Sequence, residues 1–176
     1  MINEVIKKNG ITYGITLGII SALITAAIYA IDLKLFVSGW IGASTFIIYL
    51  VTGIVLLTKT KKDISGFFSF KDAFTTYFIT IVIALLISTL FSTLLFNIID
   101  PEAKETINQH LIKYMAETLQ KFGTPASAIN ETLAKMKKTS PFSTLEQLKG
   151  LGFSVALYSI LGLILAAFFK SKTIQE

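Results

Sequence analysis

The chain of 176 residues lacks cysteine and arginine, and it has a single histidine, His110. Without cysteine there is no disulfide and no thiolate metal site, and one histidine supplies too few ligands for zinc. Phosphate-binding loops, nucleophile elbows and dinucleotide-binding glycine patterns are also missing. We therefore expect no metal, no cofactor, no catalytic residue and no enzyme activity, and we expect His110 to be an exposed surface residue.

Charge is scarce as well, because 15% of the residues are charged and 53% are hydrophobic. Four long runs carry no charge, namely Ile11–Ile31, Leu35–Thr58, Ala73–Ile99 and Gly150–Phe169. About 20 apolar residues in a helix cross the ~30 Å hydrocarbon core of a bilayer. The runs predict an all-α fold, an integral membrane four-helix bundle that forms one domain over residues 1–176.

The absence of ionisable groups from these runs argues against a proton-coupled transporter, since such proteins carry them inside the membrane. A pore lined by hydroxyls and backbone carbonyls stays open as an alternative. The same hydroxyls can instead bond to the backbone of their own helix or to a neighbouring helix. The hydroxyls in question belong to Thr12, Thr16, Thr25, Thr45, Thr52 and Thr80.

The lysines are distributed unevenly around the four runs. Two precede the first run, four lie within residues 59–72 and two follow the fourth run, whereas the segment between the first two runs has only Lys34. Basic residues stay on the cytoplasmic side of short flanks. We expect both termini and residues 59–72 to be cytoplasmic. The net charge of +5 is then a topology signal, and no nucleic-acid partner is expected.

Residues 100–149, between the third and fourth runs, predict an extracytoplasmic insert of two amphipathic helices. Asp100 suits a helix N-cap, Pro101 the first helical position and Gly123 the position after a helix. A second start follows at Pro125. Apolar residues recur at helical spacing, as Ile107, Leu111, Tyr114, Met115, Leu119 and Phe122 and then as Ala126, Ile129, Leu133 and Met136. These stripes could lie on the bilayer, on each other or on a neighbouring subunit.

Two further helix starts are marked by a serine with an acid three residues later. Ser69 with Asp72 precedes the third run, and Ser143 with Glu146 precedes the fourth; both pairs are typical of a capping box. The aromatic residues around the first pair indicate an anchor at the membrane interface or a docking patch for a cytoplasmic partner.

The first run contains a ladder of small residues spaced by four, Gly10, Gly14, Gly18, Ala22, Ala26 and Ala30. Such spacing lets two helix backbones approach closely in lipid, so these six residues are our candidate helix-packing site. The partner could be another helix of the same bundle, which we favour, or a second copy of the chain. Matching small residues are Gly39, Gly42, Gly53, Gly152, Ala156, Gly162 and Ala166.

Several segments, in this order, resemble a known family. They are "NGITYGITLG", "SFKDAF", "DPE", "FGTPASAINETLAKM" and "LGLILAAFFKSK". Together they resemble the bacterial membrane family catalogued as domain of unknown function 4199, over nearly the whole chain. The resemblance implies four spans with an outer helical insert between the third and the fourth. The family carries no assigned activity, so no site residues are implied.

These observations favour a non-enzymatic inner-membrane protein, a scaffold or accessory subunit that acts through helix packing and its outer insert. The alternative is a small channel or transporter built as an oligomer. The expected partners are the lipid bilayer and either a second copy of the chain or another membrane protein.

Overall fold

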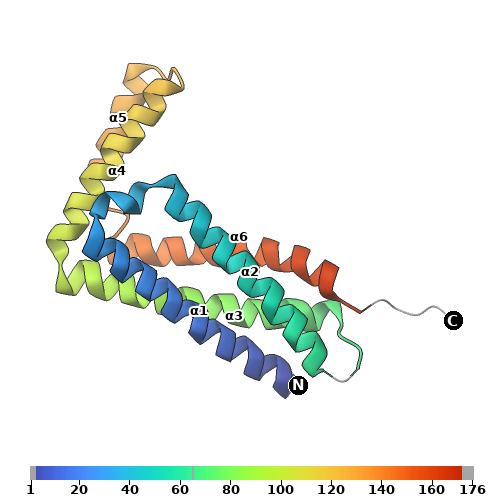
Figure 1. The fold of residues 1–176 in the computed structure, drawn as a ribbon. Helices are drawn as coiled ribbons and strands as arrows, with labels where there is room; N and C mark the ends of the chain where they lie inside the picture. Colours follow the sequence, from blue (N-terminus) through green and yellow to red (C-terminus); the bar gives the residue numbers. More distant parts are fainter. Residues whose placement is uncertain (1–2, 65, 172–176) are drawn as a thin grey trace.

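Four long helices lie side by side in the computed structural model, which describes residues 3–64 and 66–171. They are α1 (Glu4–Ile31), α2 (Gly39–Asp63), α3 (Phe70–Leu94) and α6 (Thr144–Phe169). Two further helices, α4 (Pro101–Lys121) and α5 (Ala126–Lys138), form a hairpin that stands off one end of the bundle (Figure 1). The predicted all-α architecture, with four spans and a helical insert before the last, is confirmed.

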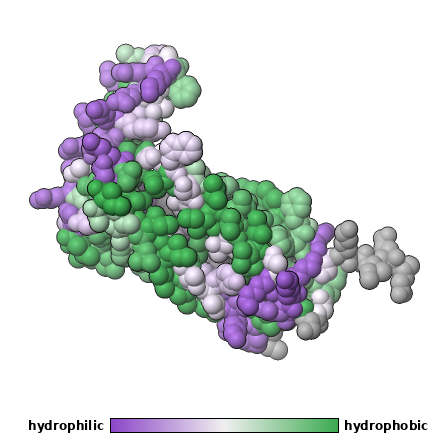
Figure 2. All heavy atoms as spheres, viewed as in Figure 1, coloured by the Kyte–Doolittle hydropathy of each residue, from purple (hydrophilic) through white to green (hydrophobic). Residues whose placement is uncertain are grey.

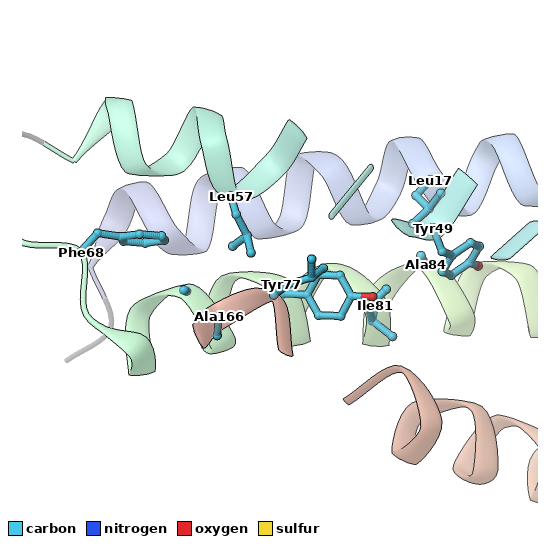
Figure 3. Packing of buried hydrophobic residues seen from close by; sticks show 10 residues of the cluster. Leu17, Tyr49, Leu57, Phe68, Tyr77, Ile81, Ala84 and Ala166 are labelled. Atoms are coloured by element: carbon cyan, nitrogen blue, oxygen red, sulfur yellow. The ribbon is translucent and has the colours of Figure 1, made fainter. Parts of the chain in front are cut away.

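Helix α3 is the centre of the bundle, because α1, α2 and α6 all pack against it. The core consists of buried side chains from all four helices and from Phe68 in the α2–α3 loop. Figure 3 shows Phe68 and Leu57 towards one end of this core, Leu17 and Tyr49 towards the other, and Tyr77 between them. The start of α1, the end of α2, the start of α3 and the end of α6 share the end opposite the hairpin (Figure 1).

The outer surface of the bundle is apolar. Large hydrophobic side chains point away from the core, among them Trp40, Phe153 and Phe168 at 84%, 72% and 80% exposed. Figure 2 shows a hydrophobic band along the bundle, with hydrophilic residues gathered at its end and on the hairpin. Exposed apolar surface on this scale needs lipid to cover it, and all four helices are long enough to span a bilayer. The chain is therefore a multi-pass membrane protein.

Most predicted helix starts are confirmed. Ser69 and Asp72 form a reciprocal capping box at α3. Asp100 accepts the backbone N–H of Ala103 at 2.9 Å, so it caps α4 with Pro101 in the first turn. Such caps satisfy backbone donors that have no partner inside the helix.

The predicted start of the second span at Leu35 is wrong. Residues Leu33–Val37 form a 3₁₀ helix, and α2 begins at Gly39. The side chain of Asp32 accepts the backbone N–H of Lys34 and so caps the short turn. The third span also changes character before it ends, because Leu95–Ile99 are wound as a π-helix.

The apolar stripes of the hairpin are covered only in part within one chain, because Tyr114 and Phe122 are 46% and 82% exposed. Helix α5 packs on α4 and buries Ile129, and the base of α4 packs on Leu33–Val37 and Leu95–Ile99. Gly123 turns the chain between the two helices at φ +69°, a conformation that glycine adopts without strain. His110 is half-buried, so the expectation of an exposed histidine is wrong.

Candidate functional site

The glycine part of the ladder lies directly against α3. A Cβ added at Gly10, Gly14 or Gly18 would sit 2.8–3.0 Å from the Cβ of Ile79, Ile83 or Ile87, respectively. All three glycines are buried. The residues opposite them are also spaced by four, so each isoleucine fills the space that one glycine leaves open. We call this contact the glycine seam.

One hydrogen bond crosses the glycine seam. The hydroxyl of Thr80 donates to the backbone oxygen of Gly10 at 3.0 Å, and it also contacts the oxygen of Thr76 in its own helix. Such a bond to a neighbouring backbone requires helices that approach closely, which the missing side chain of Gly10 permits.

The alanine part of the ladder is less enclosed. Ala22 and Ala26 are half-buried, and Ala30 is exposed. In a straight helix, residues spaced by four are offset by about 40° around the axis at each step. The stripe of small residues therefore turns away from α3 along α1. The six residues therefore do not share one contact surface.

Three of the glycines expected to match the ladder on other helices make no close contact. A Cβ at Gly39, Gly42 or Gly152 would meet no described atom within 4 Å, so these three do not form close helix contacts within the chain. The glycines of the ladder pack against isoleucines of α3 and not against other small residues. A glycine on one helix leaves enough space for a large side chain on the facing helix.

Gly53 and Gly162 instead accommodate the ring of Tyr77. A Cβ at either position would lie 2.6 Å from a carbon of that ring. The ring is buried between α2, α3 and α6, and its hydroxyl has no hydrogen-bond partner among the described residues. A buried hydroxyl without a partner costs about 1–3 kcal/mol.

A pocket of about 310 Å³ lies between the four spanning helices, in the half of the bundle nearer the hairpin. Hydroxyls from every spanning helix line it together with apolar side chains. The hydroxyl-bearing lining residues are Ser21, Thr25, Thr45, Tyr49, Ser88, Ser154 and Tyr158. We call this space the hydroxyl pocket.

Two tyrosines and one serine organise a wall of the hydroxyl pocket. The Ser21 hydroxyl donates to the oxygen of Leu17, so it accepts from the hydroxyl of Tyr49 at 3.2 Å. The rings of Tyr49 and Tyr158 stack with their centroids 4.7 Å apart. The polar lining is uncharged, which suits a neutral or weakly polar ligand with an apolar body.

The six threonines that were considered as pore-lining residues lie in different parts of the bundle. Thr25 and Thr45 line the hydroxyl pocket, and each hydroxyl donates to the oxygen four residues earlier in its own helix. Thr80 lies in the glycine seam, Thr12 and Thr16 are exposed, and Thr52 is half-buried on α2 outside the pocket lining. The serine and tyrosine hydroxyls of the pocket were not predicted.

Aromatic side chains join the hairpin to the bundle. The ring of Phe96, in the π-helical turn, is fully buried and packs edge-on against Phe36 and Phe142, with centroids 5.4 and 4.9 Å apart. The Tyr29 hydroxyl donates to Asp100 at 2.7 Å. We call this region the joint.

Polar contacts complete the joint. The Asn97 amide donates to the backbone oxygen of Phe142 at 2.9 Å, and its oxygen accepts from Lys104 at 3.1 Å. The amide of Gln147 donates to the same Phe142 oxygen at 2.8 Å. The backbone N–H of Ala103, and then the Tyr29 hydroxyl, lower the pKa of Asp100 because both stabilise its charged form.

The sequence matches the model of one protein family, described as a protein of unknown function (DUF4199), over residues 12–171. The chain belongs to the DUF4199 family. This confirms the resemblance inferred from the sequence. No curated protein and no solved structure matches the chain.

In this DUF4199 protein the hairpin carries a groove of its own, about 420 Å³ in volume. Its lining is mixed in charge and comprises Glu105, Asn108, Gln109, Ile112, Lys113, Ala116 and Lys137. The side chain of Asn108 is 3% exposed, and its oxygen has no partner among the described residues. Across residues 3–64 and 66–171, no three His, Asp or Glu side chains come close enough to share a metal ion.

Proposed function

We propose that this DUF4199 member is a non-enzymatic accessory or scaffold protein of the bacterial inner membrane, which presents the α4–α5 hairpin to another protein. In this proposal the bundle spans the bilayer and anchors the hairpin to it, with both termini and the α2–α3 loop in the cytoplasm and the hairpin on the outer side. The lysines of the short flanks support this orientation, because these flanks lie at the bundle end opposite the hairpin. Residues 100–149 carry seven lysines and six acids, but long loops count little in this rule.

One observation carries the proposal: the chain leaves the bundle and returns to it at almost the same place. Asn97 and Phe142 are joined by a 2.9 Å hydrogen bond, so a short loop could connect α3 to α6. The chain instead forms two helices, of which the 21-residue α4 is about 31 Å long at 1.5 Å per residue. A long projecting element with well-formed caps supports a role beyond connection.

The joint supports the same role, because it holds the hairpin base with buried rings and side-chain hydrogen bonds. A partner that binds a fixed hairpin loses less conformational entropy than one that binds a mobile segment. The groove with Asn108 offers a mixture of charges, an amide and apolar atoms, which fits the polar rim of a protein–protein interface better than its core.

A photo-crosslinking amino acid at two positions tests the proposal on the full chain in native membranes. Gln109, exposed on the hairpin groove, is the test position, and Phe168, 80% exposed on the apolar face of the bundle, is the control. We expect a discrete protein adduct from position 109 and lipid adducts from position 168. Protein adducts from position 168 with none from position 109 would contradict the proposal.

The hydroxyl pocket favours a second candidate function, a small oligomeric channel or transporter. Uncharged hydroxyls inside the bundle could replace part of a solute's hydration. Size in mild detergent and flux into vesicles discriminate between the two functions. A symmetric oligomer whose flux falls when Ser88 is replaced by leucine would support transport; a monomer without flux would support the accessory role.

A further inference from the structure

A second groove lies between α1 and α2, at the lysine-rich end of the bundle. It has a volume of about 400 Å³ and is apolar towards the membrane centre and cationic towards the end of α2. Its lining residues are Tyr13, Ile54, Val55, Thr58, Lys59, Lys62 and Asp63. The groove is separate from the hydroxyl pocket and shares no lining residue with it.

The helix geometry of α2 places apolar and cationic groups on one stripe. Val55, Lys59 and Lys62 are related by spacings of four and three, so they follow one face of the helix. At 1.5 Å per residue, Val55 and Lys62 are about 10 Å apart along the axis. Lys61 points elsewhere, because its ammonium group donates to the backbone oxygen of Phe169 on α6 at 2.9 Å.

The one acid in the groove is already engaged. An oxygen of Asp63 accepts from the amide of Asn9 at 2.9 Å and lies 3.7 Å from the ammonium group of Lys59. Lys62 has no acidic partner among the described residues. With two ammonium groups and one carboxylate the groove is net positive. Figure 2 shows hydrophilic residues gathered at the end of the bundle away from the hairpin, next to the hydrophobic band.

We propose that this groove binds an acidic glycerophospholipid. The phosphate lies between Lys59 and Lys62, and an acyl chain runs along Ile54 and Val55. A zwitterionic headgroup would add a cation beside the two lysines, and Asp63 is already paired. Basic pockets between spanning helices at the membrane surface suit anionic headgroups for this reason. The proposal depends on neither the partner of the hairpin nor the direction of insertion.

The test uses the purified full chain in a neutral detergent, titrated with phosphatidylglycerol or with phosphatidylcholine. Native mass spectrometry counts bound lipid, and thermal unfolding measures stabilisation. The test variant is K59Q with K62Q. The matched control is K121Q with K138Q, which removes the same charge from exposed hairpin positions.

We expect the wild type and the control to bind phosphatidylglycerol more tightly than phosphatidylcholine. K59Q with K62Q should weaken phosphatidylglycerol binding by about thirtyfold, and K62Q alone by about fivefold, since each surface lysine contributes similarly to anionic lipid binding. Equal binding of the two lipids by the wild type would overturn the proposal. Retention of phosphatidylglycerol by both lysine variants, at wild-type affinity, would also overturn it.

Discussion

The two halves of the bundle pack in different ways although the same four helices build both. In the half nearer the lysine-rich end, the glycine seam brings α1 against α3, and Leu56, Leu57 and Phe68 are fully buried. In the half nearer the hairpin, alanines replace the glycines of the ladder and the hydroxyl pocket opens between the helices. We call these the closed half and the open half.

The difference shows what one side chain changes in lipid. Helices in a membrane associate through packing and hydrogen bonds, without a hydrophobic driving force between them. Where glycine faces isoleucine, backbone and side chain meet at van der Waals distance. Where the ladder turns away from α3, hydroxyls line the space between the helices and bond mainly to backbone oxygens of their own helices. Close helix packing is thus confined to the closed half, and the space between the helices of the open half is lined by hydroxyls.

The largest expected effect comes from filling the glycine seam. Gly14→Leu would place a Cβ 2.8 Å from that of Ile83 and 3.0 Å from the oxygen of Thr80, so the helices must separate. We expect a loss of about 3 kcal/mol, at the upper end for overpacking. Thermal unfolding in detergent and folded yield measure the loss.

Two control variants allow the stability loss in the closed half to be compared with that in the open half. Ile20→Leu, on the exposed side of α1, should leave stability unchanged, and Ala26→Leu, in the open half, should cost less than Gly14→Leu. Equal losses for Gly14→Leu and Ala26→Leu would mean that the two halves do not differ as described.

Tyr77→Phe should increase stability, by about 1 kcal/mol. The substitution keeps the ring that fills the space beside Gly53 and Gly162 but removes a buried hydroxyl without a described partner. Thermal unfolding next to the wild type measures the change. A loss of stability would show that the hydroxyl is hydrogen-bonded, which would extend the polar character of the open half into the closed half.

In the open half, Ser21→Ala removes the contact with the Tyr49 hydroxyl. We expect a loss of about 0.6 kcal/mol, the average for such bonds in membranes. Ser159→Ala is the matched control, because the Ser159 hydroxyl bonds to the oxygen of Val155 in its own helix. If both variants lose the same amount, the bond across the pocket contributes nothing measurable.

The smallest expected effect is on the acid dependence of the joint. The pKa of Asp100 is lowered in the folded chain, so its contribution is present above the unfolded pKa of about 4 and is lost as the pH falls through the lower folded pKa. Asp100→Asn should therefore reduce the loss of stability between neutral and acidic pH. Unfolding curves measured at several pH values, with Glu117→Gln as control, check this; an unchanged pH profile would contradict it.

The sequence predicts those features of the fold that depend on local chemistry. Runs without charge identify the spans, and serine or aspartate at helix starts identifies the caps at Ser69 and Asp100. The start of α2 was misplaced by four residues because Leu35 is as apolar as the helix that follows. Nothing in the local sequence marks the π-helical turn, which places Phe96 among the rings of the joint.

The candidate site was predictable only in part. The ladder indicated a close helix contact, but spacing within α1 cannot identify the residues opposite, and these proved to be isoleucines of α3. The hydroxyl pocket combines side chains from four helices, so it depends on how the helices cross. A search for charged or metal-binding groups does not find it, because its polar lining consists of hydroxyls.

A hairpin that binds a partner outside the cytoplasm must lie on the outer side of the membrane. Because the chain has no cysteine, Asn130→Cys on α5 and Phe67→Cys in the α2–α3 loop each introduce a single thiol. Both positions are exposed. An impermeant thiol reagent added to intact spheroplasts should label Asn130→Cys, whereas Phe67→Cys should react only after lysis. Labelling of Phe67→Cys before lysis, with Asn130→Cys protected, would place the hairpin in the cytoplasm and contradict the account.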